Sequence, residues 1–125
     1  MEREYLNLNV YEAIQKRFSY IFQEFDNIYV SFRGGKDSGL LLNMLMDYKH
    51  KHGITKKIGV FHQDFEAQYS YTTKHVEEMF DRYMDEIDPY WVCLPMAVRT
   101  ALSSYELFWY PKKKKKQDIW VRPMP

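Results

Sequence analysis

The first thirty residues combine a helical hydrophobic stripe with a short strand-like run. Asn9 and Glu12 have the spacing of a helix N-cap and its reciprocal partner, which predicts that a helix begins there. Asp26 and Asn27 then interrupt the pattern, and the apolar run 28–32 predicts a first strand, central in a parallel sheet. The residues between these signals that share one face of the expected helix are Ile14, Phe18, Ile21, Phe22 and Phe25.

The next segments alternate between helix-like and strand-like patterns. Residues 40–50 are apolar around most of a helical circumference, so we expect a heavily buried helix that ends at Gly53. Residues 57–62 predict a second strand, and 63–68 a polar loop after it. Apolar residues recur at intervals of three and four over 69–88, which predicts a long amphipathic helix.

Prolines divide the remaining third of the chain. Pro89 is expected to end the long helix, and residues 90–94 predict a third strand that stops at Pro95. Residues 97–105 are compatible with a short helix. Residues 106–125 form an aromatic and basic C-terminal segment without a period.

The order strand, helix, strand, helix, strand predicts an α/β fold. Such a chain builds a parallel sheet through right-handed crossovers, and we expect a three-layer α/β/α sandwich. The chain of 125 residues contains no internal repeat, so we expect one minimal domain over residues 1–125.

Composition narrows the classes of partner. The 18 basic and 17 acidic residues leave a net charge of +1, so global charge gives no case for a nucleic-acid or membrane partner. No secretion signal opens the chain, no apolar run reaches the roughly 18 residues of a membrane span, and one cysteine fits a reducing compartment, so we expect a cytoplasmic protein. Eleven tyrosines and three tryptophans indicate an aromatic core, or a face covered by a protein partner or a second copy.

A glycine-rich turn stands where the first strand must become a helix. Adjacent Gly34 and Gly35 let the backbone approach an anion closely, the first helical N–H groups point at it, and Lys36 adds a positive charge. The turn is not a Walker A motif, because Val30 occupies the first glycine position and Asp37 replaces the magnesium-binding hydroxyl residue. It lacks the third glycine of a dinucleotide-binding fingerprint. A solvent-exposed turn with a helix cap is the plainer alternative.

The carboxyl ends of the expected strands would meet at one edge of the sheet, where open α/β sheets bind ligands. These ends carry the segments 33–38, 62–66 and 93–99. Arg99 is then either a phosphate ligand or a surface residue. Cys93 is interpreted as a buried strand residue, with a reactive thiol as the alternative.

The run 31–39, Ser-Phe-Arg-Gly-Gly-Lys-Asp-Ser-Gly, resembles the SFSGGKDSG pyrophosphate loop of the phosphoadenosine phosphosulfate (PAPS) reductase group. This group belongs to the adenine nucleotide α-hydrolase-like superfamily of PP-loop (HUP-like) domains. Residues 60–64, followed by 71–73, are similar to the group's second strand, which ends in an aspartate before a threonine-bearing helix. Residues 91–95, 104–106 and 120–125 resemble the branch related to a regulator of immunoglobulin-binding proteins.

The resemblance implies a site for an adenine nucleotide, ATP or PAPS, with Mg²⁺ as a cofactor. Backbone N–H groups of Gly34 and Gly35 would hold the pyrophosphate, and Ser38 would donate from the first helical turn. Lys36 and Asp37 are the catalytic candidates, with Asp37 either binding magnesium or capping the loop. The candidate nucleotide-binding residues are Ser31, Arg33, Gly34, Gly35, Lys36, Asp37, Ser38, Asp64 and Arg99.

Two departures from the family pattern leave the activity open. Arg33 stands where the family has a serine, and a guanidinium can either grip a phosphate bidentately or fill the pocket. Full-length reductases carry a nucleophilic cysteine in a C-terminal segment, which this sequence lacks, so thiol-based reduction is not expected. The alternatives are an enzyme that adenylates a substrate and releases pyrophosphate, and a degenerate domain that binds a protein or nucleic acid.

Histidines and carboxylates near the second strand allow two interpretations. His62, Asp64 and Glu66 occupy alternate positions and could bind a metal, but a polar loop near the nucleotide is favoured. His50 and His52 flank the predicted end of a helix, where a cation interacts favourably with the helix dipole.

Five consecutive lysines, Lys112–Lys116, follow an aromatic run near the C-terminus. A solvated, mobile loop is the usual structure of such a charge run. The neighbouring Trp109, Tyr110 and Trp120 favour the alternative of a nucleic-acid contact, through phosphate pairing and base stacking.

Overall fold

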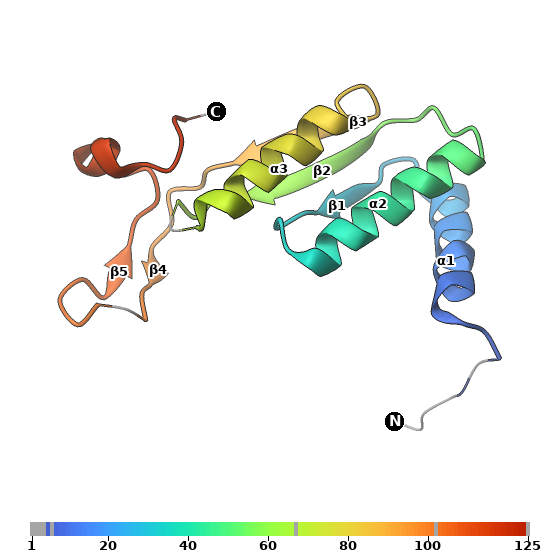
Figure 1. Cartoon of the computed structure of the whole chain (residues 1–125), viewed down its shortest axis with the longest axis horizontal. Helices are drawn as coiled ribbons and strands as arrows, with labels where there is room; N and C mark the ends of the chain where they lie inside the picture. Colours follow the sequence, from blue (N-terminus) through green and yellow to red (C-terminus); the bar gives the residue numbers. More distant parts are fainter. Residues whose placement is uncertain (1–4, 6, 67, 102, 125) are drawn as a thin grey trace.

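A computed structural model describes residues 5, 7–66, 68–101 and 103–124, arranged as a parallel sheet with helices (Figure 1). The elements in chain order are α1 (Val10–Glu24), β1 (Tyr29–Ser31), α2 (Lys36–Lys51), β2 (Ile58–Gln63), α3 (Ser70–Arg82), β3 (Ile87–Val92), β4 (Val98–Arg99), β5 (Phe108–Trp109) and the 3-10 helix η1 (Lys114–Ile119). The first three strands pair in parallel in the order β1-β2-β3, and β4 pairs antiparallel with β5. The prediction of an α/β fold with a parallel sheet is confirmed.

Helix α1 begins as predicted. The Asn9 side chain accepts a hydrogen bond from the Glu12 N–H at 2.8 Å, and the Glu12 carboxylate accepts one from the Asn9 N–H at 3.0 Å. The stripe of α1 reaches the core through Phe18, whose ring packs edge-on against Tyr48 of α2 with the ring centroids 5.6 Å apart. Phe25 lies just past the helix and is 52% exposed, so the stripe ends before it.

Helices α2 and α3 cover the same face of the sheet (Figure 1). The core lies between that face and the two helices, and comprises Phe18, Val30, Phe32, Leu42, Leu45, Met46, Tyr48, Ile58, Val60, Val76, Met79 and Ile87. The opposite face is open among the described residues, with Tyr29 73% and Tyr90 55% exposed. The described elements thus form two layers instead of the expected three, because both crossovers run in one direction along the sheet. For the same reason β1 is an edge strand here, and β2 takes the central place expected for the first strand.

Helix α2 is longer and more exposed than its composition indicates. It begins at Lys36, directly after the glycine turn, and not at residue 40. Leu40 and Leu41 are 62% and 42% exposed, so the expectation of burial around most of the helix is wrong. Gly53 adopts φ +60° just after the helix, which confirms its role in ending α2.

Helix α3 ends earlier, and strand β3 begins earlier, than the sequence pattern predicts. The helix ends at Arg82, and residues 83–86 form a turn before β3 begins at Ile87. Pro89 therefore lies inside a strand and does not end the helix. A proline can occupy β3 because this strand is at the edge of the described sheet, where a missing N–H leaves no neighbour unpaired.

The short helix expected over 97–105 is absent from the described part of that segment. Val98–Arg99 instead pairs with Phe108–Trp109 as a small hairpin that lies beyond the carboxyl edge of the main sheet (Figure 1). Residue 67 of the expected polar loop, residue 102 of the expected helix and the final residue, 125, lie outside the described residues. None of the described helices has the length and apolar character needed to cross a membrane.

Candidate functional site

The turn between β1 and α2 has a conformation that only glycine fits at one position. Gly34 adopts φ +78°, and a Cβ atom added there would lie 2.8 Å from the Cγ2 atoms of both Thr72 and Val76 on α3. Gly35 is less constrained, because its backbone is extended and no atom lies within 4 Å of an added Cβ. The turn is therefore fastened to α3 through Gly34.

Helix α2 presents its first turn directly after this glycine pair. The first intrahelical hydrogen bond runs from the Gly39 N–H to the Gly35 carbonyl at 2.9 Å, so the N–H groups of residues 36–38 have no acceptor within the helix. Gly35 has no side chain to cap them, and the Ser38 hydroxyl donates to the Gly35 carbonyl at 3.1 Å. Lys36 and Asp37 are exposed on this turn. Several of the predicted ligands thus lie together at an uncapped helix N-terminus.

Asp64 lies at the end of β2 but turns its carboxylate into the protein, where only 5% of the residue is exposed. One oxygen accepts the Glu66 N–H at 2.7 Å and the other accepts the Trp91 indole N–H at 3.0 Å. Burial by itself raises the pKa of Asp64, but these two hydrogen bonds and the Lys112 ammonium outweigh it and lower the pKa. The predicted nucleotide ligand is thus already bound by protein donors.

Asp64, Glu66 and Lys112 form a buried cluster that we call the lysine anchor. The Lys112 ammonium lies 2.8 Å from Glu66 and 3.4 Å from Asp64, and it donates to the Arg122 carbonyl at 2.7 Å. The side chains of Lys112 and Glu66 are 6% and 2% exposed. Glu66 also accepts the Val121 N–H. The anchor therefore fastens the C-terminal segment to the carboxyl edge of the sheet.

The rest of the lysine run is also more ordered than predicted. Lys116 lies 2.6 Å from Glu106 and its ammonium is 5.0 Å from the centre of the Trp109 ring. Lys113–Lys115 are exposed. The expectation of a solvated run is therefore wrong for its first member, which is buried in the anchor, and Lys114–Ile119 fold as the 3-10 helix η1.

A metal site at His62, Asp64 and Glu66 is not formed. The part of the chain that the structure describes contains no group of three His, Cys, Asp or Glu side chains placed to hold a metal ion. His62 is fully buried, its Nδ1 lies 2.9 Å from the Phe32 carbonyl oxygen, and its ring centroid is 4.6 Å from that of Trp91. Burial lowers the pKa of His62, so its ring is neutral at pH 7. The other interpretation, a polar loop near the nucleotide, is also wrong, because His62 belongs to β2 and all three side chains are buried.

Cys93 lies one residue beyond β3 and is half-buried. Its Sγ is 3.6 Å from an Asp64 carboxylate oxygen. Burial and the neighbouring negative charge raise its pKa, which keeps the sulfur protonated and disfavours the reactive-thiol alternative.

The two histidines at the end of α2 have local partners, in keeping with their interpretation as helix-end residues. His50 Nε2 lies 2.7 Å from a Glu86 carboxylate oxygen. His52 is the C-cap residue of α2, and its Nδ1 lies 2.9 Å from the Tyr48 carbonyl oxygen. Both side chains belong to the far end of α2 from the glycine turn.

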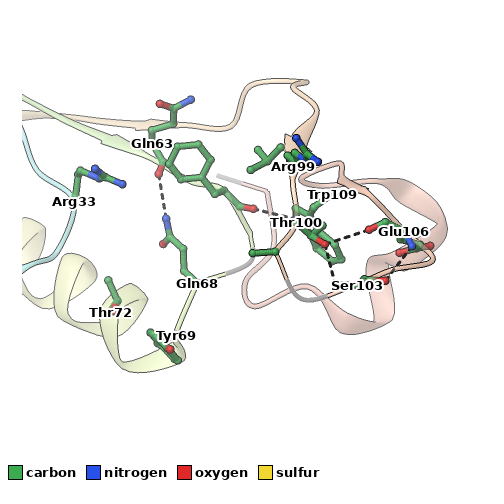
Figure 2. A pocket seen from close by; sticks show the side chains of 13 residues that line it. Arg33, Gln63, Gln68, Tyr69, Thr72, Arg99, Thr100, Ser103, Glu106 and Trp109 are labelled. Carbon is green, nitrogen blue, oxygen red and sulfur yellow. Dashed lines mark hydrogen bonds between the residues drawn. The ribbon is translucent and has the colours of Figure 1, made fainter.

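A cavity of about 800 Å³ opens beside the glycine turn (Figure 2). Its walls come from the end of β1, the end of β2, the start of α3 and the β4–β5 hairpin. It brings together two predicted ligands, Arg33 and Arg99, on walls that are distant in the sequence. Ser31 and residues 34–38 do not line it. Sequence reasoning missed the cavity because nothing in the pattern of 97–109 predicted a hairpin there.

Comparison with known proteins identifies one curated relative. The chain is 38% identical over 122 residues to the Uncharacterized protein YbdN of Escherichia coli (strain K12), an alignment that covers 96% of this chain. The chain spans 29% of the length of that relative. No protein-family model and no solved structure matches the chain.

Proposed function

We propose that the turn 33–38 binds the pyrophosphate of an adenine nucleotide, ATP or PAPS, in the manner of a PAPS-reductase-like PP-loop domain. The observation that carries the proposal is Gly34, whose left-handed backbone and close packing on α3 hold the turn directly before the uncapped start of α2. An uncapped helix N-terminus with free N–H groups is a favourable place for phosphate oxygens.

Each exposed side chain of the turn has a role in this proposal. The Lys36 ammonium neutralises the pyrophosphate, and the Arg33 guanidinium adds a bidentate donor where a serine would add a single hydroxyl. Asp37 is exposed in the first turn of α2, and one carboxylate together with nucleotide phosphates is a common way to bind magnesium. If the domain is catalytic, a substrate attacks the α-phosphate and these cations stabilise the pyrophosphate that leaves.

Binding without catalysis is the second candidate function, and the lysine anchor favours it. Asp64 would be the carboxylate of the second strand available for chemistry, but Trp91, Glu66 and Lys112 already hold it. A histidine does lie beside the turn, because His75 Nε2 of α3 is 3.8 Å from a Cβ added at Gly39, so the case against catalysis rests on Asp64 alone. Under this proposal the domain recognises a nucleotide, or uses exposed Lys113–Lys115 and its aromatic residues to contact nucleic acid or a protein.

Isothermal titration calorimetry with ATP and with PAPS, each with and without MgCl₂, tests the proposal. Lys36→Ala is expected to weaken binding at least about tenfold, because a charge-assisted contact to phosphate is lost. Lys16→Ala is the matched control, since Lys16 is an exposed lysine on α1. Asp37→Ala is expected to reduce only the magnesium-dependent part of the affinity.

Failure to bind either nucleotide would refute the proposal. Binding accompanied by pyrophosphate release from ATP would support the enzyme, whereas tight binding without release would support the second candidate. A salt-dependent mobility shift of labelled tRNA that is lost in a variant with Lys113–Lys115 changed to Ala would support the nucleic-acid contact.

A further inference from the structure

The cavity beside the glycine turn has a mostly apolar wall with two cations. Phe65, Val98 and Trp109 supply apolar surface from the end of β2 and from the hairpin. Arg33 projects from the end of β1 and Arg99 belongs to β4, so the two cations come from different walls (Figure 2). Within the described residues neither guanidinium has an ion-pair partner. Glu106, the one carboxylate on the lining, is paired with Lys116 at 2.6 Å.

Hydrogen bonds hold the walls of the cavity in place. The Trp109 indole N–H donates to the Phe65 carbonyl at 3.1 Å, which ties the hairpin to the end of β2. The Gln68 side chain donates to the Gln63 carbonyl at 3.2 Å, which ties the start of α3 to the same strand (Figure 2). The cavity is therefore preformed, as ligand pockets generally are.

We propose that this cavity binds a small organic anion distinct from the proposed nucleotide, a molecule with an apolar or aromatic body and a carboxylate or sulfonate group. The volume of about 800 Å³ lies in the range of small-molecule pockets. The apolar wall accommodates the body of the ligand. Either guanidinium can donate two hydrogen bonds to its acidic group, since neither has a carboxylate partner among the described residues. The cavity shares Arg33 with the proposed pyrophosphate turn, but Arg99 and the apolar wall take no part in the contacts proposed for the nucleotide.

The test uses 8-anilinonaphthalene-1-sulfonate as the probe, an aromatic sulfonate whose fluorescence rises in an apolar site. We expect one probe molecule to bind per chain. Arg33→Gln and Arg99→Gln should each weaken binding about tenfold, because each removes a charge-assisted hydrogen bond. Arg99→Lys keeps the positive charge but lacks the bidentate donor geometry, so its affinity for the probe should lie between those of the wild type and Arg99→Gln. Arg17→Gln, at an exposed position of α1, is the matched control and should leave binding unchanged.

A neutral probe and a nucleotide competition complete the test. N-phenyl-1-naphthylamine has a similar aromatic body without the sulfonate, and it should bind more weakly and not respond to either arginine change. Equal binding of the two probes, or sulfonate binding that both arginine variants retain, would overturn the proposal. Displacement of the sulfonate by ATP that is equally strong in Lys36→Ala would also overturn it, because the cavity would then itself be the nucleotide site. Loss of ATP binding in Lys36→Ala with unchanged probe binding would support two separate sites.

Discussion

Gly34 connects a sequence motif to a local conformation. Its φ of +78° lies in the left-handed region, and its Cα faces the Thr72 and Val76 side chains with no room for a methyl group. The neighbouring Gly35 has neither constraint. The two glycines are equivalent in the motif but differ in what the structure demands of them.

Substitution of the two glycines by alanine should therefore have unequal effects. Gly34→Ala is expected to lower the free energy of unfolding by about 2–4 kcal/mol, from a strained φ and an overpacked contact with α3. Gly35→Ala should cost about 0.5 kcal/mol, because alanine is only a somewhat poorer N-cap than glycine. Urea unfolding followed by circular dichroism measures both. Equal losses would contradict the role given to the Gly34 conformation.

Lys112 is the residue in the basic run whose loss should matter for stability. Lys112→Met leaves Asp64 and Glu66 buried without their cation, and removal of one partner from a buried ion pair typically costs about 3–5 kcal/mol. Lys115→Met, at an exposed position of the same run, should change the free energy of unfolding by less than about 0.5 kcal/mol. Urea denaturation of both variants checks the difference, and equal stability would show that the anchor contributes nothing.

At the scale of elements, side-chain contacts attach the C-terminal segment to the rest of the fold. Over residues 106–124, which the structure describes, its regular structure is the two residues of β5 and the 3-10 helix η1. It is held by Lys112 and by the N–H of Val121, both bound to Glu66, and by Arg122, which lies 3.8 Å above the Trp91 ring and 3.2 Å from Glu77. The C-terminal segment is therefore held in place by side-chain contacts and not by an amphipathic helix packed on the core.

Limited proteolysis can test this attachment. Glu66→Gln weakens the pair with Lys112, so trypsin should cleave after Lys113–Lys116 several times faster than in the wild type, because the local opening free energy falls. Glu78→Gln is the matched control, since Glu78 lies on an exposed face of α3 and pairs only with Lys74 among the described residues. Mass spectrometry locates the first cuts. Initial cleavage elsewhere in the chain would indicate global unfolding and contradict a local anchor.

For the whole molecule, burial of titratable groups in a small core couples stability to pH. The pKa of His62 lies below the 6.5 of an exposed histidine because the ring is buried. Below pH 6.5 this histidine is protonated in the unfolded chain, whereas in the folded chain it stays neutral until the pH reaches its lowered pKa. Stability from this group is therefore complete above pH 6.5 and is lost as the pH falls from 6.5 toward the lowered pKa.

The free energy of unfolding is accordingly expected to fall between pH 7.5 and pH 5.5. His62→Asn keeps an N–H donor for the Phe32 carbonyl but cannot titrate, so its unfolding free energy should vary less over this interval than that of the wild type. Urea titrations at several pH values give the two slopes. Identical slopes would show that His62 does not titrate on unfolding.

Much of the fold followed from local patterns, and much of the site did not. The Asn9 cap and the Gly53 helix end were predictable, because each depends on neighbours within a few residues. The parallel sheet was predictable from the alternation of strand-like and helix-like segments. The end of α3 was not, since the apolar stripe continues through Ile87 although that residue is buried in β3. A helical stripe and a buried strand share apolar residues, and only the sheet register separates them.

The sequence by itself determined the glycine turn between a strand and a helix, with its lysine and aspartate, because that motif is contiguous and its chemistry is local. Only the tertiary structure decided which charged side chains are paired in the interior and which line a cavity. It buried Lys112 against Asp64 and Glu66, and it placed Arg33 and Arg99 on one cavity. These partners are dozens of residues apart in the sequence, and the free energy of pairing or exposing a charge depends on surroundings that only the folded chain supplies.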